Sequence, residues 1–350
     1  MTAPVSAAHV LRVPAEPAAA PGTTSLRALF ETPGNRAIML DASRDPNAGL
    51  TIFLIPGEAD QPRLAVKLAT NRVTADLIVR ESRLLADLEC RQMGHVDPTL
   101  PRLAGVFDLD GMPAVATTVV PGIPIRTAYH EFRHVARRDL VKADFAAASR
   151  WLAGLHADSM AETAPISLLT GVPELVTARW PNDPVASAVA QGLECVAARL
   201  AAGRTPRTVV HGDFWAGNVL VTDRVVTGVV DWASGQLSGE PLGDVARFAL
   251  SYALYLDRHT RPGRAVVGHP GLRADGWGAG IRYALAGQQW FGRLVRDFVT
   301  GALVRLGAPA GLWREVLLAG LAEIAVVADH PDFAAQHRDL LLRLMSEVQS

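Results

Sequence analysis

The stretch HGDFWAGNVLV, residues 211–221, places polar side chains directly before a run of β-branched residues. His211, Asp213 and Asn218 are groups that a strand entering a hydrophobic core normally lacks. Asp and Asn in loops usually cap turns, so for either residue alone a structural role is the ordinary interpretation. The residues that follow in the chain decide between a capping role and a chemical one.

Two short apolar runs, NVLVT and VVTGVVD, follow this loop and are joined by an Asp-Arg pair, which predicts a β-hairpin. Asn218 opens the first strand and Asp231 closes the second, so both are expected at the same end of the hairpin. Asp213 lies in the loop that leads to that end. Two carboxylates and an amide oxygen suit Mg²⁺, and such a site suits phosphoryl transfer, with Asp213 accepting the proton of an attacking hydroxyl. The three residues together favour chemistry over capping.

The pattern HGDxxxxN at residues 211–218, with VVDW at 229–232 and GEPLGDVA at 239–246, resembles the aminoglycoside phosphotransferase and choline kinase family. The resemblance spans roughly residues 35–255 and is most specific between 208 and 250. These proteins are small-molecule kinases with a protein-kinase-like fold. The resemblance therefore implies an enzyme that uses ATP and Mg²⁺ to phosphorylate a hydroxyl group of a small molecule, such as an antibiotic, an amino alcohol or a sugar-like metabolite.

The resemblance also implies roles for individual residues. Asp213 would be the catalytic base, Asn218 and Asp231 would bind the metal ions, and His211 would brace the loop by hydrogen bonds. Asp244 precedes an apolar helical run, so we expect it to cap that helix and to anchor the catalytic loop.

Trp215 separates two branches of kinases. Protein kinases of the Ser/Thr type carry a lysine two residues after the catalytic aspartate, whereas this chain has a tryptophan there. The small-molecule branch tolerates other residues at that position. Trp215 therefore favours a small-molecule acceptor over a protein.

A lysine for the nucleotide phosphates is expected in the β-rich part of the chain. The run RLAVKLA, residues 63–69, places Lys67 in an otherwise apolar strand, and the next helix carries Glu81. A strand lysine followed by a helix glutamate matches the kinase ion pair that orients the α- and β-phosphates. Taken alone, a strand lysine is more often a surface residue, and Glu89, nearer the helix end, is the competing partner.

The remaining nucleotide contacts are expected from two connections. The segment SRDPNAG, residues 43–49, would cover the phosphates with Ser43 among its donors, although a plain hairpin turn explains it nearly as well. Adenine would lie against the connection between the lobes, at the Thr118 carbonyl and the Val120 amide. The same residues would also fit an ordinary strand end, because adenine recognition there uses backbone groups. The sequence does not distinguish ATP from GTP.

The order of these patterns predicts an α+β chain with a two-lobed, protein-kinase-like fold. Residues 1–24, rich in Ala and Pro, are expected to be a mobile tail. Alternating runs and one amphipathic helix predict a small β-rich nucleotide-binding lobe over residues 25–120. Helical patterns dominate residues 121–350, which we expect to form the larger lobe, with the catalytic loop at 208–233 and the acceptor-binding helices.

Composition excludes several classes of protein. The chain has 350 residues and a formal net charge of −1, so no global field would attract nucleic acid or an anionic membrane. Cys90 and Cys195 are the only cysteines, which favours a reducing compartment and disfavours a zinc site. The start does not resemble a signal peptide, and no apolar run is long enough to span a membrane. We therefore expect a cytoplasmic location, and the oligomeric state stays open.

The acceptor site is the least legible part of the sequence. Beyond residue 245 the chain has no lysine and slightly more arginines than acidic residues, so a strongly acidic pocket for a polycation is not indicated. The loop at 268–280 and the arginines at 247, 282 and 293 lie either on an ordinary surface or near the acceptor. Aromatic residues in this region either pack the core or contact a ligand: Trp277, Tyr283, Trp290, Phe291 and Trp313.

Two other functions remain open alongside the small-molecule kinase. A protein kinase is disfavoured by Trp215 and by a phosphate-covering segment with a single glycine, Gly49. A nucleotide-binding pseudokinase that acts as a scaffold would be favoured by loss of Asp213, Asn218 or Asp231, and all three are present.

Overall fold

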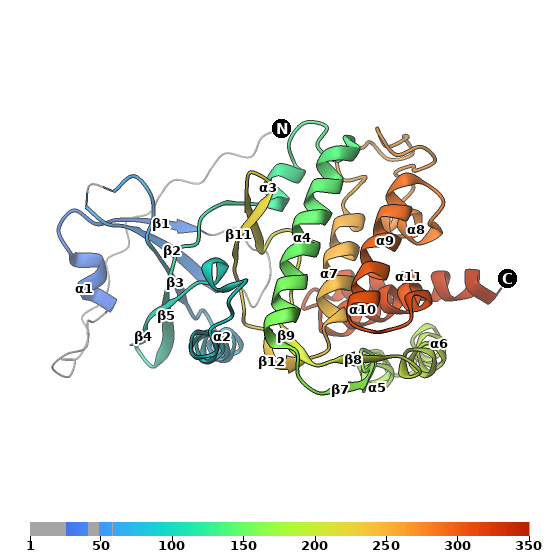
Figure 1. Cartoon of the computed structure of the whole chain (residues 1–350), viewed down its shortest axis with the longest axis horizontal. Coiled ribbons are helices and arrows are strands. Elements are labelled where there is room, and N and C mark those ends of the chain that lie inside the picture. The colour runs from blue at the N-terminus through green and yellow to red at the C-terminus, as the bar shows by residue number, and fades with distance from the viewer. Residues whose placement is uncertain (1–25, 41–48, 58, 350) are drawn as a thin grey trace. The chain divides into compact units, whose positions relative to one another are not determined.

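The computed structural model describes residues 26–40, 49–57 and 59–349. The predicted tail at 1–24 lies outside these residues. Within them the chain divides into two compact units. The first comprises the residues up to 92 together with 100–120 and 232–234, and the second comprises 93–99, 121–231 and the residues from 235 onward. A small antiparallel sheet dominates the first unit and helices dominate the second (Figure 1), so the predicted α+β class is confirmed.

The first unit is built on an antiparallel sheet with strand order β1-β2-β3-β5-β4. Its strands are β1 (Arg36–Leu40), β2 (Leu50–Ile55), β3 (Leu64–Leu68), β4 (Leu103–Leu109) and β5 (Met112–Thr118). Its helices are α1 (Leu26–Glu31) and α2 (Arg72–Arg91).

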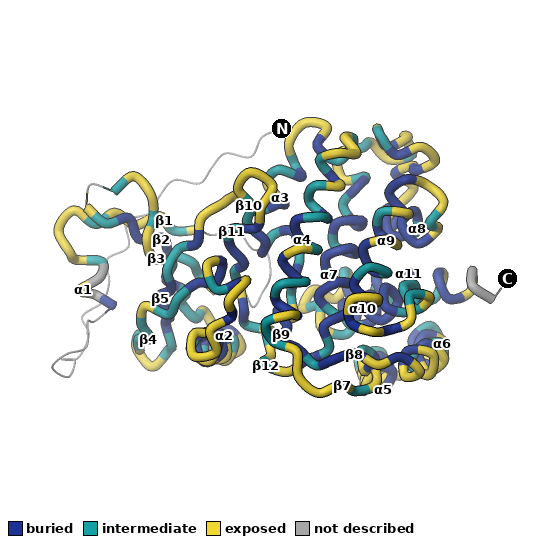
Figure 2. The backbone as a smooth tube through the Cα atoms, viewed as in Figure 1, coloured by how far each residue is buried: buried dark blue, intermediate teal, exposed yellow. Residues whose placement is uncertain are grey.

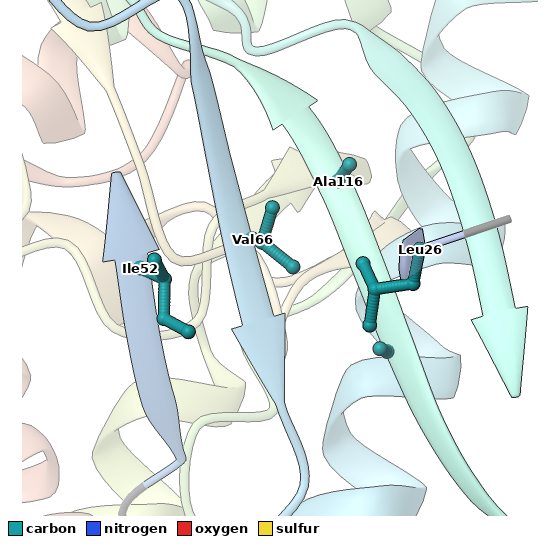
Figure 3. Packing of buried hydrophobic residues seen from close by; sticks show 5 residues of the cluster. Leu26, Ile52, Val66 and Ala116 are labelled. Atoms are coloured by element: carbon teal, nitrogen blue, oxygen red, sulfur yellow. The ribbon is translucent and has the colours of Figure 1, made fainter. Parts of the chain in front are cut away.

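The two faces of this sheet carry different residues because side chains alternate along a strand. Val66 in β3 pairs with Ile52 on one side and Ala116 on the other, and Leu26 of α1 packs against this row (Figure 3). All four side chains are buried. Lys67, the next residue of β3, therefore points to the opposite face.

Helix α2 covers part of the sheet and begins at a well-defined cap. The Asn71 side chain accepts a hydrogen bond of 2.9 Å from the Thr74 amide, which satisfies one of the free N–H groups of the first turn. The helix ends where Gln92 adopts a left-handed conformation with φ of 54°. Its buried residues recur at helical spacing and include Ile78, Glu81 and Leu85, so a glutamate lies on the face that packs.

The second unit is mainly helical. Its longer helices are α4 (Arg138–Ser159), α6 (Pro184–Ala201), α7 (Leu242–Leu254), α9 (Trp290–Arg305), α10 (Trp313–Val327) and α11 (Pro331–Gln349). Its shorter helices are α3 (Ile125–Tyr129), α5 (Val172–Arg179) and α8 (Ala279–Ala286), with 3₁₀ turns at Asp97–Thr99 and Ala310–Leu312.

Short strands of the second unit form three small sheets. β10 (Val219–Thr222) lies between β11 (Val225–Val229) and β6 (Ile123–Pro124). The other two pairs are β9 (Thr208–Val210) with β12 (Gln236–Gly239), and β7 (Thr163–Pro165) with β8 (Arg204–Pro206).

Ten of the 13 residues of helix α7 are buried, so this helix runs through the interior of the second unit (Figure 2). Phe248 and Tyr252 of α7 meet Phe145 of α4 edge to face, with ring centroids 5.3 and 5.0 Å apart. Phe298 of α9 closes the cluster at 5.2 Å from Phe145. Such pairs add to the burial energy of the rings, so α7 is held rigidly.

The stability of the second unit is expected to depend on His156 at low pH. This side chain of α4 is 2% exposed, and neither ring nitrogen has a hydrogen-bond partner among the described residues. Burial lowers the pKa of His156 to about 3. The unfolded chain therefore takes up a proton as the pH falls below about 6.5, while the folded chain does not, and the free energy of unfolding decreases with falling pH.

His156→Leu removes this proton uptake. The decrease in the unfolding free energy between pH 7 and pH 4, measured by urea denaturation, is expected to be smaller in the variant by roughly 3 kcal/mol. His330→Leu, at an exposed histidine, serves as the control and leaves the decrease unchanged. An identical pH dependence of wild type and His156→Leu would contradict the prediction.

Candidate functional site

The carboxylate of Asp244 anchors the loop at residues 211–218. This carboxylate is 2% exposed and accepts hydrogen bonds from the His211 amide at 2.7 Å and the Gly212 amide at 2.8 Å. Burial raises the pKa of Asp244. The expectation that Asp244 anchors this loop is confirmed. The expectation that it caps α7 is wrong, because the helix starts at Leu242 and both carboxylate oxygens are used by the loop.

His211 and Phe214 fix the loop on either side of Asp213. The Nδ1 atom of His211 accepts from the Asp213 amide at 3.2 Å, and Nε2 lies 2.9 Å from the Val230 carbonyl, so these partners assign the proton to Nε2. The Phe214 ring is fully buried and stacks on Trp151, with centroids 5.1 Å apart. The Asp213 backbone is thereby held on both sides.

The predicted hairpin brings Asn218 and Asp231 to the same end. Val219 pairs with Val229, and the Val230 amide donates to the Asn218 carbonyl at 3.0 Å. The turn residues 223 and 224 both have positive φ, 49° and 64°, as a tight two-residue hairpin turn requires. Asp231 follows with φ of 70°, a left-handed conformation that Asp tolerates better than most residues.

Asp213 is held at this end by two side chains. The Asn218 amide nitrogen donates to the Asp213 carboxylate at 3.1 Å and to its carbonyl at 3.0 Å. The Arg247 guanidinium lies 2.8 Å (Nε) and 2.6 Å (Nη2) from the other carboxylate oxygen. Burial raises the pKa of Asp213, the charge of Arg247 opposes this, and the nearby charge of Asp231 adds to it. The Asp213 carboxylate is therefore partly desolvated and lies near both a cation, Arg247, and a second carboxylate, Asp231.

Arg247 is one of three arginines that the sequence left undecided between a surface and an acceptor-side position. It lies one helical turn beyond Asp244 on α7, and residues three apart share a helix face. Both side chains thus reach the same loop. The spacing of three residues between Asp244 and Arg247 was visible in the sequence. Only the contact of Asp244 with the loop shows that this face of α7 is turned towards Asp213.

The first unit contains a second cluster of charged residues. The Lys67 ammonium lies 2.7 Å from each oxygen of the Glu81 carboxylate, whose side chain is 4% exposed. Glu81 also accepts from the amide of Trp232, which belongs to the same unit, at 3.1 Å. Glu89 instead lies 3.8 Å from Arg102 on the surface. Lys67 therefore pairs with Glu81 and not with the competing glutamate.

Of the other residues expected to contact the nucleotide, the structure describes Thr118 and Val120 but not Ser43. Thr118 ends β5, where its amide donates to the Arg102 carbonyl and its hydroxyl accepts from the Arg102 amide, both at 2.8 Å. Val120 is buried. Ser43 lies outside the described residues. A side chain at Gly49 would come within 3.1 Å of the Leu68 carbonyl, so this glycine permits close packing.

Most of the aromatic residues beyond residue 245 pack the core. Tyr283, Trp290 and Phe291 are buried, and the first two also donate hydrogen bonds to the carbonyls of Pro270 and Gly268. Trp277 is only half-buried.

In the described part of the chain no group of three or more His, Cys, Asp or Glu side chains is arranged to hold a metal ion. No helix of that part is long and apolar enough to cross a membrane.

Comparison with known proteins identifies similar chains. Residues 50–280 match the model of a family described as the phosphotransferase enzyme family. A solved structure of a thermostable mutant of aminoglycoside phosphotransferase APH(4)-Ia, in a ternary complex with AMP-PNP and hygromycin B, is 14% identical with a TM-score of 0.54, covering 92% of this chain and 98% of that one. ADP-bound aminoglycoside phosphotransferase APH(2'')-Ib is 14% identical with a TM-score of 0.52, covering 92% and 96%. No curated protein matches the sequence.

Proposed function

Because this chain belongs to the phosphotransferase enzyme family, we propose that it transfers the γ-phosphoryl group of ATP to a hydroxyl group of a small molecule. The observation that carries the proposal is the environment of Asp213. Its carboxylate is oriented by Asn218 and Arg247 at the open end of a hairpin, and Asp231 lies close enough to raise its pKa. A fixed, desolvated carboxylate can accept the proton of an attacking hydroxyl.

Asn218 and Asp231 would hold Mg²⁺. Their oxygens are the hard ligands that this ion prefers, and the negative charge that Asp231 adds near Asp213 favours a cation there. Because the amide nitrogen of Asn218 donates to Asp213, the amide oxygen is the atom that would bind the ion. Two protein ligands are enough for Mg²⁺, because waters and substrate phosphates usually fill the rest of its coordination shell. When bound, the ion neutralises charge on the phosphates.

Lys67 would contact the α- and β-phosphates. Both carboxylate oxygens of Glu81 hold the ammonium in one position. Because the lysine side chain is already ordered, it loses less conformational entropy when the nucleotide binds. The Thr118 carbonyl and the Val120 amide would contact the adenine edge, and Ser43 would donate to a phosphate. GTP remains the alternative nucleotide.

An acceptor screen tests the proposed function. The purified chain with Mg-ATP is expected to add one phosphate to a member of a panel of aminoglycosides, macrolides, choline-like amines, amino alcohols and sugars, read by mass spectrometry, with one ADP formed per product. Binding of Mg-ATP without phosphorylation of any acceptor would favour a pseudokinase scaffold. Transfer to peptides but to none of these small molecules would favour a protein kinase. Either outcome would contradict the proposal.

A further inference from the structure

A cavity of about 290 Å³ that is widely open to solvent lies beside the C-terminal end of α7, within the second unit. It is lined by Leu254, Tyr255, Asp257, Arg258 and the segment 276–278, which includes Trp277. None of the residues that position Asp213 belongs to this lining. The cavity is thus a separate feature that the phosphate-transfer chemistry does not explain.

Helix α7 connects this cavity to Asp213. Arg247, which contacts Asp213, is followed four residues later by Ser251 on the same face of the helix, and after another four by Tyr255, the residue that caps its C-terminal end. Ser251 and Tyr255 also line a pocket of only about 10 Å³, roughly the room for one water, together with Trp215 of the catalytic loop. Tyr255 lines both pockets. The eight-residue separation of Arg247 and Tyr255 corresponds to about 12 Å along the helix axis. A ligand with two or more rings is long enough to reach from one end to the other.

The carboxylate of Asp257 lacks a partner in another described residue. Burial raises the pKa of Asp257, and the hydrogen bond that opposes this rise comes from its own backbone amide. No cationic side chain lies within ion-pair distance of it in the described residues. A half-buried carboxylate that faces a cavity can accept hydrogen bonds from an amine or a hydroxyl group of a ligand.

Aromatic surface dominates the rest of the lining. Trp277 is half-buried, and Tyr255 lies under the Arg258 guanidinium at 5.3 Å. In the smaller pocket, Arg126 lies over Trp215 at 5.2 Å, next to Tyr129. The lining of the cavity contains one cation, Arg258, and one carboxylate, Asp257, so it offers no excess of negative charge to a polycation. The cavity suits a ligand with an apolar ring face and a single basic group.

We propose that this cavity binds the distal ring of the phosphate acceptor, with the ring face against Trp277 and Tyr255 and one amine or hydroxyl group bonded to Asp257. The acceptor class is a glycoside with an apolar ring system and at most one basic amine, and polyamino sugars are poor ligands. This inference rests on the proposed function, since the other end of the acceptor presents its hydroxyl to Asp213.

Two probes test the acceptor class with the full chain and Mg-ADP. A macrolide that carries one dimethylamino sugar is expected to bind at least tenfold more tightly, by isothermal titration calorimetry, than the polyamino sugar kanamycin. Equal or tighter binding of kanamycin, or no binding of the macrolide, would overturn the inference. Binding is measured without transfer, so this result is independent of whether any acceptor is phosphorylated.

Two variants test the cavity itself. Asp257→Asn and Trp277→Ala are each expected to weaken macrolide binding about tenfold, since each removes one contact with the distal ring. Asp275→Asn, the same change at an exposed residue of the neighbouring loop, is the matched control and leaves binding unchanged. Unchanged affinity in both cavity variants would overturn the inference, and retained affinity for Mg-ADP verifies that the variants are folded.

Discussion

Asp213→Asn is expected to lower kcat at least about 100-fold, because an amide cannot accept the proton of the attacking hydroxyl. The substitution keeps the shape of the side chain, and the amide oxygen can still accept a hydrogen bond from Arg247. Arg247 is 28% exposed, so water compensates for its lost anionic partner, and the free energy of unfolding changes by about 1 kcal/mol or less. Nucleotide affinity, measured by fluorescence titration with Mg-ATP, is expected to stay within a few-fold of wild type.

A matched control makes this result interpretable. Asp223→Asn is the same chemical change in the exposed turn of the same hairpin, at a positive φ of 49° that Asn also tolerates. It is expected to keep wild-type turnover. Full turnover by Asp213→Asn would exclude Asp213 as the base, whatever the control shows.

Lys67→Met is expected to reduce kcat/KM for ATP by about 100-fold, because it removes the cation that would contact the phosphates. It also leaves the Glu81 carboxylate, 4% exposed, without its cation. Removing one partner of a buried ion pair is costly, and the partial exposure of Lys67, 23%, reduces that cost to roughly 1–3 kcal/mol of unfolding free energy. Loss of activity alone would therefore not separate a chemical role from a structural one.

The double variant Lys67→Met/Glu81→Gln separates the two roles. It removes the uncompensated charge, while the Gln side chain can still accept the hydrogen bond from the Trp232 amide. Stability by urea denaturation is expected to return towards wild type, and activity is expected to stay low. Recovery of turnover together with stability would show that Lys67 supports the fold and does not contact the nucleotide.

The local pattern of the sequence determined the hairpin and its ends. The Asp-Arg turn and the two apolar runs set the pairing, and the alternation of strand residues then placed Asn218 and Asp231 together. The pair of Lys67 and Glu81 was predicted because a strand lysine followed by a helix glutamate matches the kinase ion pair, and the structure selects Glu81 over Glu89. These features depend on spacing within short segments, which is why the sequence suffices for them.

Tertiary packing decided the features that join distant segments. Arg247 reaches Asp213, and Asp244 anchors the loop and does not cap its helix, because α7 packs against the loop in a particular rotation. The aromatic residues beyond residue 245 divide in the same way. Tyr283 and Trp290 enter the core, while Trp277 lines a cavity beside Asp257. A helix or loop can present any of its faces until its neighbours are placed, so the sequence alone indicated the reaction chemistry, and only the folded second unit revealed the candidate acceptor cavity.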